Sequence, residues 1–188
     1  MKKVLAMVLA MLMMAVPVFA ESVEETAAPE ERVRVAVLEG MEEEILEYQY
    51  ECEGIYTMWY DYENYIVADF YGHPMFVPVD ETAEEHTASF MVVVSEIAVE
   101  NADALLGEAV GNYDPENVGE VLTVETEQGT VVKSIEVTEE DHVTRFYLVV
   151  GETQVLCITA EMPIDALEGA GVRFDWMAQS IEFVESAE

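Results

Sequence analysis

Three histidines are the first residues whose type and surroundings could support chemistry in this 188-residue chain. His86 directly follows Glu85, and His142 directly follows Asp141, each at the end of a short acidic run. Carboxylate oxygens beside an imidazole can bind a divalent cation, so Glu85, His86, Asp141 and His142 are candidate metal ligands. Both pairs also lie where a loop should meet a strand, and solvated polar residues are ordinary there. The pattern leaves a cation site and simple solvation open.

A segment dense in aromatic residues is the second candidate. Ten of the eighteen aromatic residues lie within residues 48–76. Aromatic side chains fill cores, but tyrosine and tryptophan beside carboxylates also suit sugars or flexible peptides. We expect segment 48–76 to form the contact face for a protein or glycan ligand. The residues predicted to form that face are Tyr56, Trp59, Tyr62, Tyr65 and Tyr71.

Motifs of the common enzyme classes are absent from the sequence. It has no nucleophile elbow, no HExxH, no P-loop and no calcium-loop pattern. With 40 acidic residues, pairs of carboxylates occur at any spacing and do not indicate acid/base catalysis. Since no nucleophile, base and orienting group can be assembled, we predict that the protein is not an enzyme. We expect no cofactor, unless the acidic clusters bind a divalent cation.

Acidic residues dominate the charge of the chain. The 40 aspartates and glutamates face 7 lysines and arginines, which gives a net charge of −33 at pH 7. Such a surface repels phosphate backbones and anionic lipids over a Debye length of about 10 Å. Nucleic acid and acidic membranes are therefore excluded as partners. The charge favours solubility and a monomer, or alternatively attracts cations or a basic partner.

The N-terminus has the composition of a secretory signal peptide. Lys2 and Lys3 precede an apolar run over residues 4–16, which Pro17 follows, with small residues up to Ala20. This pattern predicts a signal peptide over residues 1–20, cleaved after Ala20. The mature chain is then secreted and does not insert into a membrane, because the sequence has no second apolar run of spanning length.

The remaining residues predict one domain behind a short leader. Residues 21–31 have no apolar period, and five of these eleven residues are acidic, so we predict a disordered acidic leader. Residues 32–185 have the length of one domain, and residues 32–52 read as a hairpin added at its start. The chain has two cysteines, Cys52 and Cys157, both in predicted strands. Export permits a disulfide, but buried cysteine also packs as a small apolar residue, so both alternatives stay open.

Hydrophobic periodicity predicts mainly antiparallel strands in the rest of the chain. Asn101 is predicted to cap a helix that ends at Gly111. Four strands separated by short turns then predict a meander. The last two strands are apolar on both faces, so we expect interior strands that are covered on two sides. The four strands span residues 121–126, 130–138, 142–150 and 153–160.

A second helix is predicted after the meander. Asp165 and Glu168 have the spacing of a capping box, and apolar residues then step by three and four up to Ile181. Gly169 and Gly171 each disfavour a helix interior by roughly 1 kcal/mol. The alternatives are therefore a close backbone approach at these glycines or a helix that begins near Gly171.

This order of elements resembles the PsbP-like superfamily. The resemblance is carried by GIYTMWYD (54–61), the first helix, the meander, TAEMP (159–163) leading into a helix, and the final SIEF (180–183). It implies an α+β fold, with an antiparallel sheet and helices packed on its faces as an α/β/α sandwich. It also implies a bacterial secreted member of a group that mostly binds without catalysis. No residue-level functional motif of the family carries over.

We therefore expect a secreted, non-catalytic binding or accessory protein with its contact face in segment 48–76. The alternative is a divalent metal-ion-binding protein that uses the acidic and histidine clusters at residues 85–86 and 141–142.

Overall fold

The computed structural model describes residues 29–38, 40–52, 54–79, 89–95, 101–126 and 128–184. The predicted signal peptide and most of the acidic leader lie outside these residues. The first strand begins at residue 31, one residue before the predicted start of the domain. The strands of the described part are β1 (Glu31–Leu38), β2 (Met41–Cys52), β3 (Tyr56–Asp61), β4 (Tyr65–Phe70), β5 (His73–Pro78), β6 (Ser89–Ser95), β7 (Leu122–Glu125), β8 (Val131–Thr138), β9 (His142–Val150), β10 (Val155–Pro163) and β11 (Glu182–Phe183).

The smaller of two antiparallel sheets has the strand order β1-β2-β3-β11. The predicted hairpin over residues 32–52 is present as β1 and β2. Strand β2 pairs along its second half with β3, and β3 pairs on its other side with the short β11. The hairpin therefore belongs to a second sheet, which the C-terminal strand completes.

The larger sheet has the order β4-β5-β6-β10-β9-β8-β7. Its second half is the predicted meander, since β7, β8, β9 and β10 pair in sequence. Strands β9 and β10 are interior, and their side chains alternate between two hydrophobic clusters. Tyr147, Leu156 and Ile158 belong to one cluster, while Leu148 and Val155 belong to the other. The prediction that these strands are covered on both faces is confirmed.

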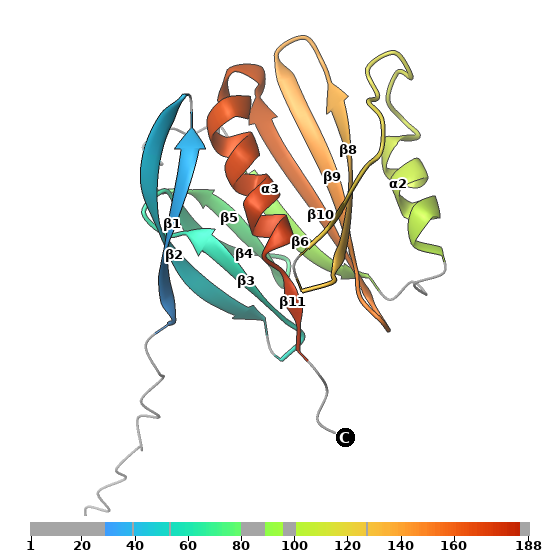
Figure 1. Cartoon of the computed structure of the whole chain (residues 1–188). Helices are drawn as coiled ribbons and strands as arrows, with labels where there is room; N and C mark the ends of the chain where they lie inside the picture. Colours follow the sequence, from blue (N-terminus) through green and yellow to red (C-terminus); the bar gives the residue numbers. More distant parts are fainter. Residues whose placement is uncertain are drawn as a thin grey trace, which may run out of the picture.

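The layers explain these two clusters. Helix α2 (Ala102–Val110) covers one face of the large sheet, where Leu106 packs with Ile135 and Leu148. Helix α3 (Val172–Gln179) and the small sheet cover the opposite face, where Phe174 and Met58 are fully buried. Figure 1 shows α3 between the β1–β2 hairpin and the large sheet, with α2 beside β8 and β9. The predicted α+β class, with helices on both faces of an antiparallel sheet, is confirmed.

The predicted helix caps are wrong in detail. Asn101 precedes α2, but its side chain makes no capping hydrogen bond. Asp165 and Glu168 do not form a capping box, because a 3-10 turn over Ile164–Ala166 and a π-helical turn over Leu167–Gly171 come before α3. A Cβ at Gly171 would lie 3.2 Å from the Met162 sulfur. The alternative of a helix that begins near Gly171, with a close approach there, is the one observed.

The two cysteines do not join in a disulfide. Cys52 packs against the cluster between the sheets, whereas Cys157 packs against the cluster under α2. These clusters lie on opposite faces of the large sheet, so the thiols are separated by the sheet itself. In the described part of the chain, no helix is long and apolar enough to cross a membrane.

Candidate functional site

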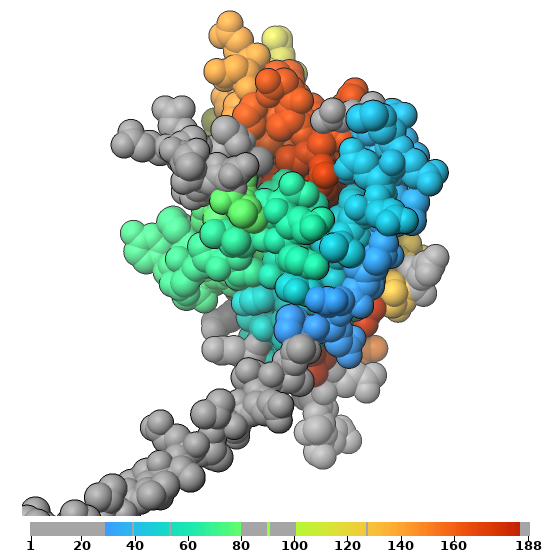
Figure 2. All heavy atoms as spheres, turned by 90° about the vertical axis from the view of Figure 1, so that its left-hand side faces the viewer, coloured from blue at the N-terminus to red at the C-terminus, as the bar shows by residue number. Residues whose placement is uncertain are grey.

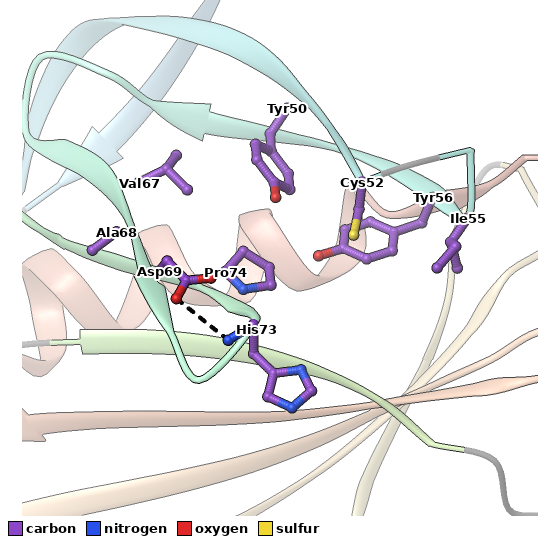
Figure 3. A pocket seen from close by; sticks show the side chains of 10 residues that line it. Tyr50, Cys52, Ile55, Tyr56, Val67, Ala68, Asp69, His73 and Pro74 are labelled. Atoms are coloured by element: carbon purple, nitrogen blue, oxygen red, sulfur yellow. Dashed lines mark hydrogen bonds between the residues drawn. The ribbon is translucent and has the colours of Figure 1, made fainter.

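A pocket of about 480 Å³ lies where the β4–β5 hairpin approaches the end of the small sheet. Every residue that lines it comes from the aromatic segment 48–76. One wall is formed by β2, the following turn and β3, and the other wall by β4, β5 and the turn between them (Figure 3). The lining residues are Tyr50, Cys52, Ile55 and Tyr56 on the first wall, and Val67, Ala68, Asp69, Gly72, His73 and Pro74 on the second.

Tyr56 is the unusual residue of this pocket. Its side chain is fully buried, and its hydroxyl oxygen has no hydrogen-bond partner of good geometry among the described residues, although the Cys52 thiol interacts with it. Burial raises the pKa of this hydroxyl well above its ordinary value, and the neighbouring Cys52 and Tyr50 raise it further. In Figure 3 the hydroxyl points from β3 toward the hairpin wall. A buried polar group without a partner costs about 1–3 kcal/mol, so this hydroxyl is a candidate ligand contact.

The β4–β5 hairpin turns in two residues, Tyr71 and Gly72. Both have positive φ angles, 54° and 85°, as a type I′ turn requires. Glycine adopts this conformation freely, but for a tyrosine it costs roughly 1–2 kcal/mol. The Tyr71 side chain is 88% exposed, and its ring meets the ring of Phe70 edge-on at 4.7 Å. The hairpin therefore presents two rings to solvent at the rim of the pocket.

The hairpin wall also supplies the ionisable groups of the pocket. Asp69 is exposed, and one of its carboxylate oxygens accepts a hydrogen bond of 3.4 Å from the backbone N–H of Gly72. His73 is half-buried beside it, and no lysine or arginine lines the pocket. Four polar side chains, those of Tyr50, Tyr56, Asp69 and His73, thus line a mainly apolar space. Few polar groups in an apolar concavity are typical of small-molecule sites.

The pocket holds a cysteine and a histidine, yet they do not form a nucleophile and base. A nucleophilic cysteine needs a base within hydrogen-bond reach. No hydrogen bond joins Cys52 to His73 within the described part of the chain.

The predicted contact face of five aromatic residues does not exist as one surface. Tyr56 and Tyr65 are 0% and 5% exposed, because they point from β3 and β4 into the core between the sheets. The Tyr65 ring packs at 5.4 Å from Phe174 of α3. These two residues therefore stabilise the fold, and of Tyr56 only the hydroxyl faces the pocket.

Trp59 and Tyr62 are half-buried and lie outside the pocket. The Arg32 guanidinium stacks 4.2 Å above the Trp59 ring, and Tyr48 stacks on Tyr62 with their ring centroids 3.6 Å apart. Both rings already have partners within the chain. Of the five predicted residues, only Tyr71 is a largely exposed ring beside the pocket.

Of the predicted metal ligands, only Asp141 and His142 lie within the described residues. Asp141 is exposed and His142 is half-buried at the turn between β8 and β9. No group of three histidine, cysteine or acidic side chains in the described part of the chain could hold a metal ion. Glu85 and His86 lie outside the described residues.

The pocket lies within segment 48–76, but most of its lining residues were not among those predicted. Asp69, His73 and Cys52 were not predicted as residues of the contact face. The signal that could have found them is a two-residue turn between alternating strands, which makes a hairpin. The hairpin would have indicated that Asp69 and His73 lie close together across it.

Each lysine and arginine that the structure describes forms a salt bridge within the chain. Glu47 is buried and receives both Arg32 and Arg34, and Arg173 pairs with the buried Asp61 at 2.9 Å. The other two basic residues, Arg145 and Lys133, pair with acidic residues near α3 and α2 respectively. With its described cations paired internally, the outer surface remains strongly acidic.

Comparisons with known proteins show likeness in fold alone. No family model matches the sequence, and no curated protein matches it. The structure resembles the solution structure of cyanobacterial PsbP (CyanoP) from Synechocystis sp. PCC 6803, at 14% identity, over 72% of this chain and 91% of that chain, with a TM-score of 0.49. It also resembles a crystal structure from Bacteroides thetaiotaomicron VPI-5482, at 11% identity and a TM-score of 0.51, over 74% of this chain.

The chain spans about half, 49%, of that second protein. The antiparallel sheet with helices on both faces, which the resemblance implied, is observed.

Proposed function

We propose that this protein is an exported, non-catalytic binding protein that holds an uncharged, hydroxyl-bearing ligand, such as a sugar unit, in the pocket beneath the β4–β5 hairpin. The observation that carries this proposal is the buried hydroxyl of Tyr56, which lines the pocket and has no partner among the described residues. A ligand hydroxyl would give it that partner. Buried polar groups are nearly always hydrogen-bonded, so ligand binding would remove an existing penalty.

The chemistry of the lining favours a sugar hydroxyl over other ligand groups. A hydroxyl both donates and accepts, so one ligand can accept from Tyr56 and donate to the Asp69 carboxylate. Val67, Ile55 and Pro74 provide apolar surface for the carbon face of a sugar ring. Phe70 and Tyr71, which lie next to the lining residues Asp69 and Gly72 in the sequence, are exposed but do not line the pocket. An anionic ligand would meet Asp69 without a lysine or arginine to balance it.

Export and the absence of catalysis are parts of the same proposal. The N-terminal pattern of two lysines, an apolar run and a small residue at Ala20 supports secretion with cleavage after Ala20. The lack of a hydrogen bond between Cys52 and His73, within the described residues, supports binding without a covalent step. An accessory role would follow if the bound sugar belongs to a larger glycan.

Titration with three monosaccharides of one ring shape tests the proposal. Glucose, glucosamine and glucuronate differ mainly in charge, and binding to residues 21–188 can be followed by amide NMR shifts. We expect saturable shifts around Asp69 and His73 for glucose and glucosamine, and at least about tenfold weaker binding of glucuronate. Related hexoses and disaccharides extend the same panel.

The matched variant is Tyr56→Phe, which removes the hydroxyl and keeps the ring. One neutral hydrogen bond is worth about 1 kcal/mol, so this variant should bind the sugar roughly fivefold more weakly. Tyr147→Phe removes a buried hydroxyl far from the pocket and should leave the affinity unchanged. Absence of saturable binding across the panel, or equal binding by Tyr56→Phe, would overturn the proposal.

A further inference from the structure

Strand β1 is an edge strand whose outer side is open. It pairs with β2 on one side, and among the described residues no strand pairs with its other side. The backbone N–H and C=O groups along that side can receive another strand. Native proteins usually protect such an edge with charged side chains, a proline or a bulge. None of these protects the outward face of β1 between residues 32 and 38.

The exposed face of β1 is a stripe of three valines. Val33, Val35 and Val37 are 56%, 60% and 65% exposed, and they alternate with Arg32 and Arg34 on the opposite face. Figure 2 shows β1 at the surface of the molecule, on the side that carries the small sheet. An open backbone edge and an exposed apolar stripe in one strand together form a surface for strand addition.

The two arginines of β1 are not available to an outside partner. Their guanidinium groups bind the buried carboxylate of Glu47, and they also lie over the rings of Trp59 and Trp176. Between residues 32 and 38 the incoming strand therefore meets valines and backbone, and the exposed carboxylate of Glu31 lies at the start of β1.

We infer that β1 pairs in antiparallel fashion with β1 of a second copy of this chain, joining the two small sheets into one across a twofold axis. The sequence of the strand is self-complementary in this register. With Val35 on the axis, Val35 faces its own copy and Val33 faces Val37 of the other chain. On the opposite face Arg34 meets Ala36, so over residues 32–38 no like charges stand opposite each other.

A second copy fits better than a basic or acidic strand because residues 32–38 contain no carboxylate in a chain with 40 of them. Apart from the exposed Glu31 at its start, this strand thus adds little to the repulsion between two highly acidic molecules. The stripe is flanked by Glu42 and Glu44 of β2, which lie across from Val37 and Val35. Salt screens the repulsion between these glutamates and between the net charges of the two copies, so we predict that the dimer strengthens as salt increases. The charge alone had led us to expect a monomer.

Sedimentation velocity of residues 21–188 from about 10 µM to about 200 µM, at about 50 mM and about 500 mM salt, tests this inference. We expect a monomer–dimer equilibrium that shifts toward dimer at high salt. Val35→Lys places two lysines opposite each other and should weaken the dimer at least about tenfold. Val124→Lys, on the exposed edge strand β7 of the other sheet, is the matched control and should have no effect.

Cysteine cross-linking tests the register. Opposed residues of an antiparallel pair have Cα atoms about 4.5–5.5 Å apart, which permits a disulfide. Val35→Cys should therefore form a disulfide-linked dimer under mild oxidation, identified by peptide mass, whereas Val33→Cys should not link to its own copy. A monomer at every concentration and salt would overturn the inference. So would a dimer that is unaffected by Val35→Lys, or equal cross-linking at both positions.

Discussion

Replacement of Tyr56 by phenylalanine should make the free protein more stable. The tyrosine ring is fully buried in the cluster between the two sheets, and phenylalanine keeps those contacts. The variant loses only the hydroxyl, which is buried without a hydrogen-bond partner among the described residues. Most replacements of a buried residue destabilise a protein, so a gain in stability here is a distinctive outcome.

The size of the gain follows from the state of that hydroxyl. An unsatisfied buried polar group destabilises the folded protein by about 1–3 kcal/mol. Removing it recovers this free energy, but the small gap left by the missing oxygen offsets part of the gain. We expect the free energy of unfolding to rise by about 1–2 kcal/mol. For a domain of this length each kcal/mol raises Tm by roughly 2–4 °C.

Tyr147→Phe is the control because it makes the same chemical change at a second buried tyrosine. The Tyr147 hydroxyl donates a hydrogen bond of 2.8 Å to the Asp175 carboxylate of α3. A hydrogen bond to a charged group is worth about 1.5–3 kcal/mol, so this variant should be destabilised by about that amount. Urea unfolding followed by circular dichroism measures both variants under the same conditions.

The two variants should therefore change stability in opposite directions. If Tyr56→Phe is destabilised as much as Tyr147→Phe, the Tyr56 hydroxyl has a partner in solution. The pocket would then lack the unsatisfied group that motivates a ligand. If Tyr56→Phe is more stable and also binds sugar more weakly, the same hydroxyl destabilises the free protein and stabilises the complex.

Four further changes test other parts of the structure. Gly151→Ala places a Cβ 2.8 Å from the ring of Phe183, so urea unfolding should show a loss of about 1–3 kcal/mol as β11 is displaced. Arg145→Gln leaves two partly buried carboxylates without their cation and should cost about 3 kcal/mol in the same assay. Burial raises the pKa of Tyr65 to about 12, whereas an unfolded tyrosine ionises near pH 10. Because the folded state keeps the proton between these values, the free energy of unfolding should fall from about pH 10 to about pH 12. The fall should be less steep in Tyr65→Phe. Tyr71→Asn relieves the positive φ angle at an exposed turn and should raise the free energy of unfolding by about 0.5–1 kcal/mol, while a decrease would contradict the strain.

The fold could be predicted where local pattern and environment agree. In β9 and β10 successive side chains alternate between two apolar clusters, and a run that is apolar on both faces indicates an interior strand. The irregular turns before α3 could not be predicted, although a start near Gly171 was one of the two alternatives, and Gly171 there closely approaches Met162 of β10. That contact is tertiary, and the capping-box spacing of Asp165 and Glu168 carries no information about it.

The site could be predicted as a segment but not residue by residue. Alternation along β3 separates Tyr56 from Trp59 onto opposite faces, yet it does not tell which face is exposed. Neither face of β3 is exposed, because one face packs on the large sheet and the other on α3. The backbone N–H of Trp59 donates a hydrogen bond of 2.9 Å to the hydroxyl of Ser180. Both faces of β3 are buried because it lies in a second sheet. That sheet depends on pairing between β3 and the C-terminal β11, which is far away in the sequence.

Two locally unfavourable features coincide in one small region of the structure. Elsewhere the buried carboxylates of Glu47 and Asp61 bind arginines, and the buried hydroxyl of Tyr147 binds Asp175, although the Nη2 atom of Arg32 is also buried without a hydrogen-bond partner among the described residues. At the pocket, by contrast, Tyr56 has an unpaired hydroxyl and Tyr71 a strained backbone. Each costs about 1–2 kcal/mol out of the 5–15 kcal/mol that typically stabilises a domain. Departures from local consistency concentrate at functional sites, so their coincidence favours this hairpin as the binding region over the other exposed surfaces.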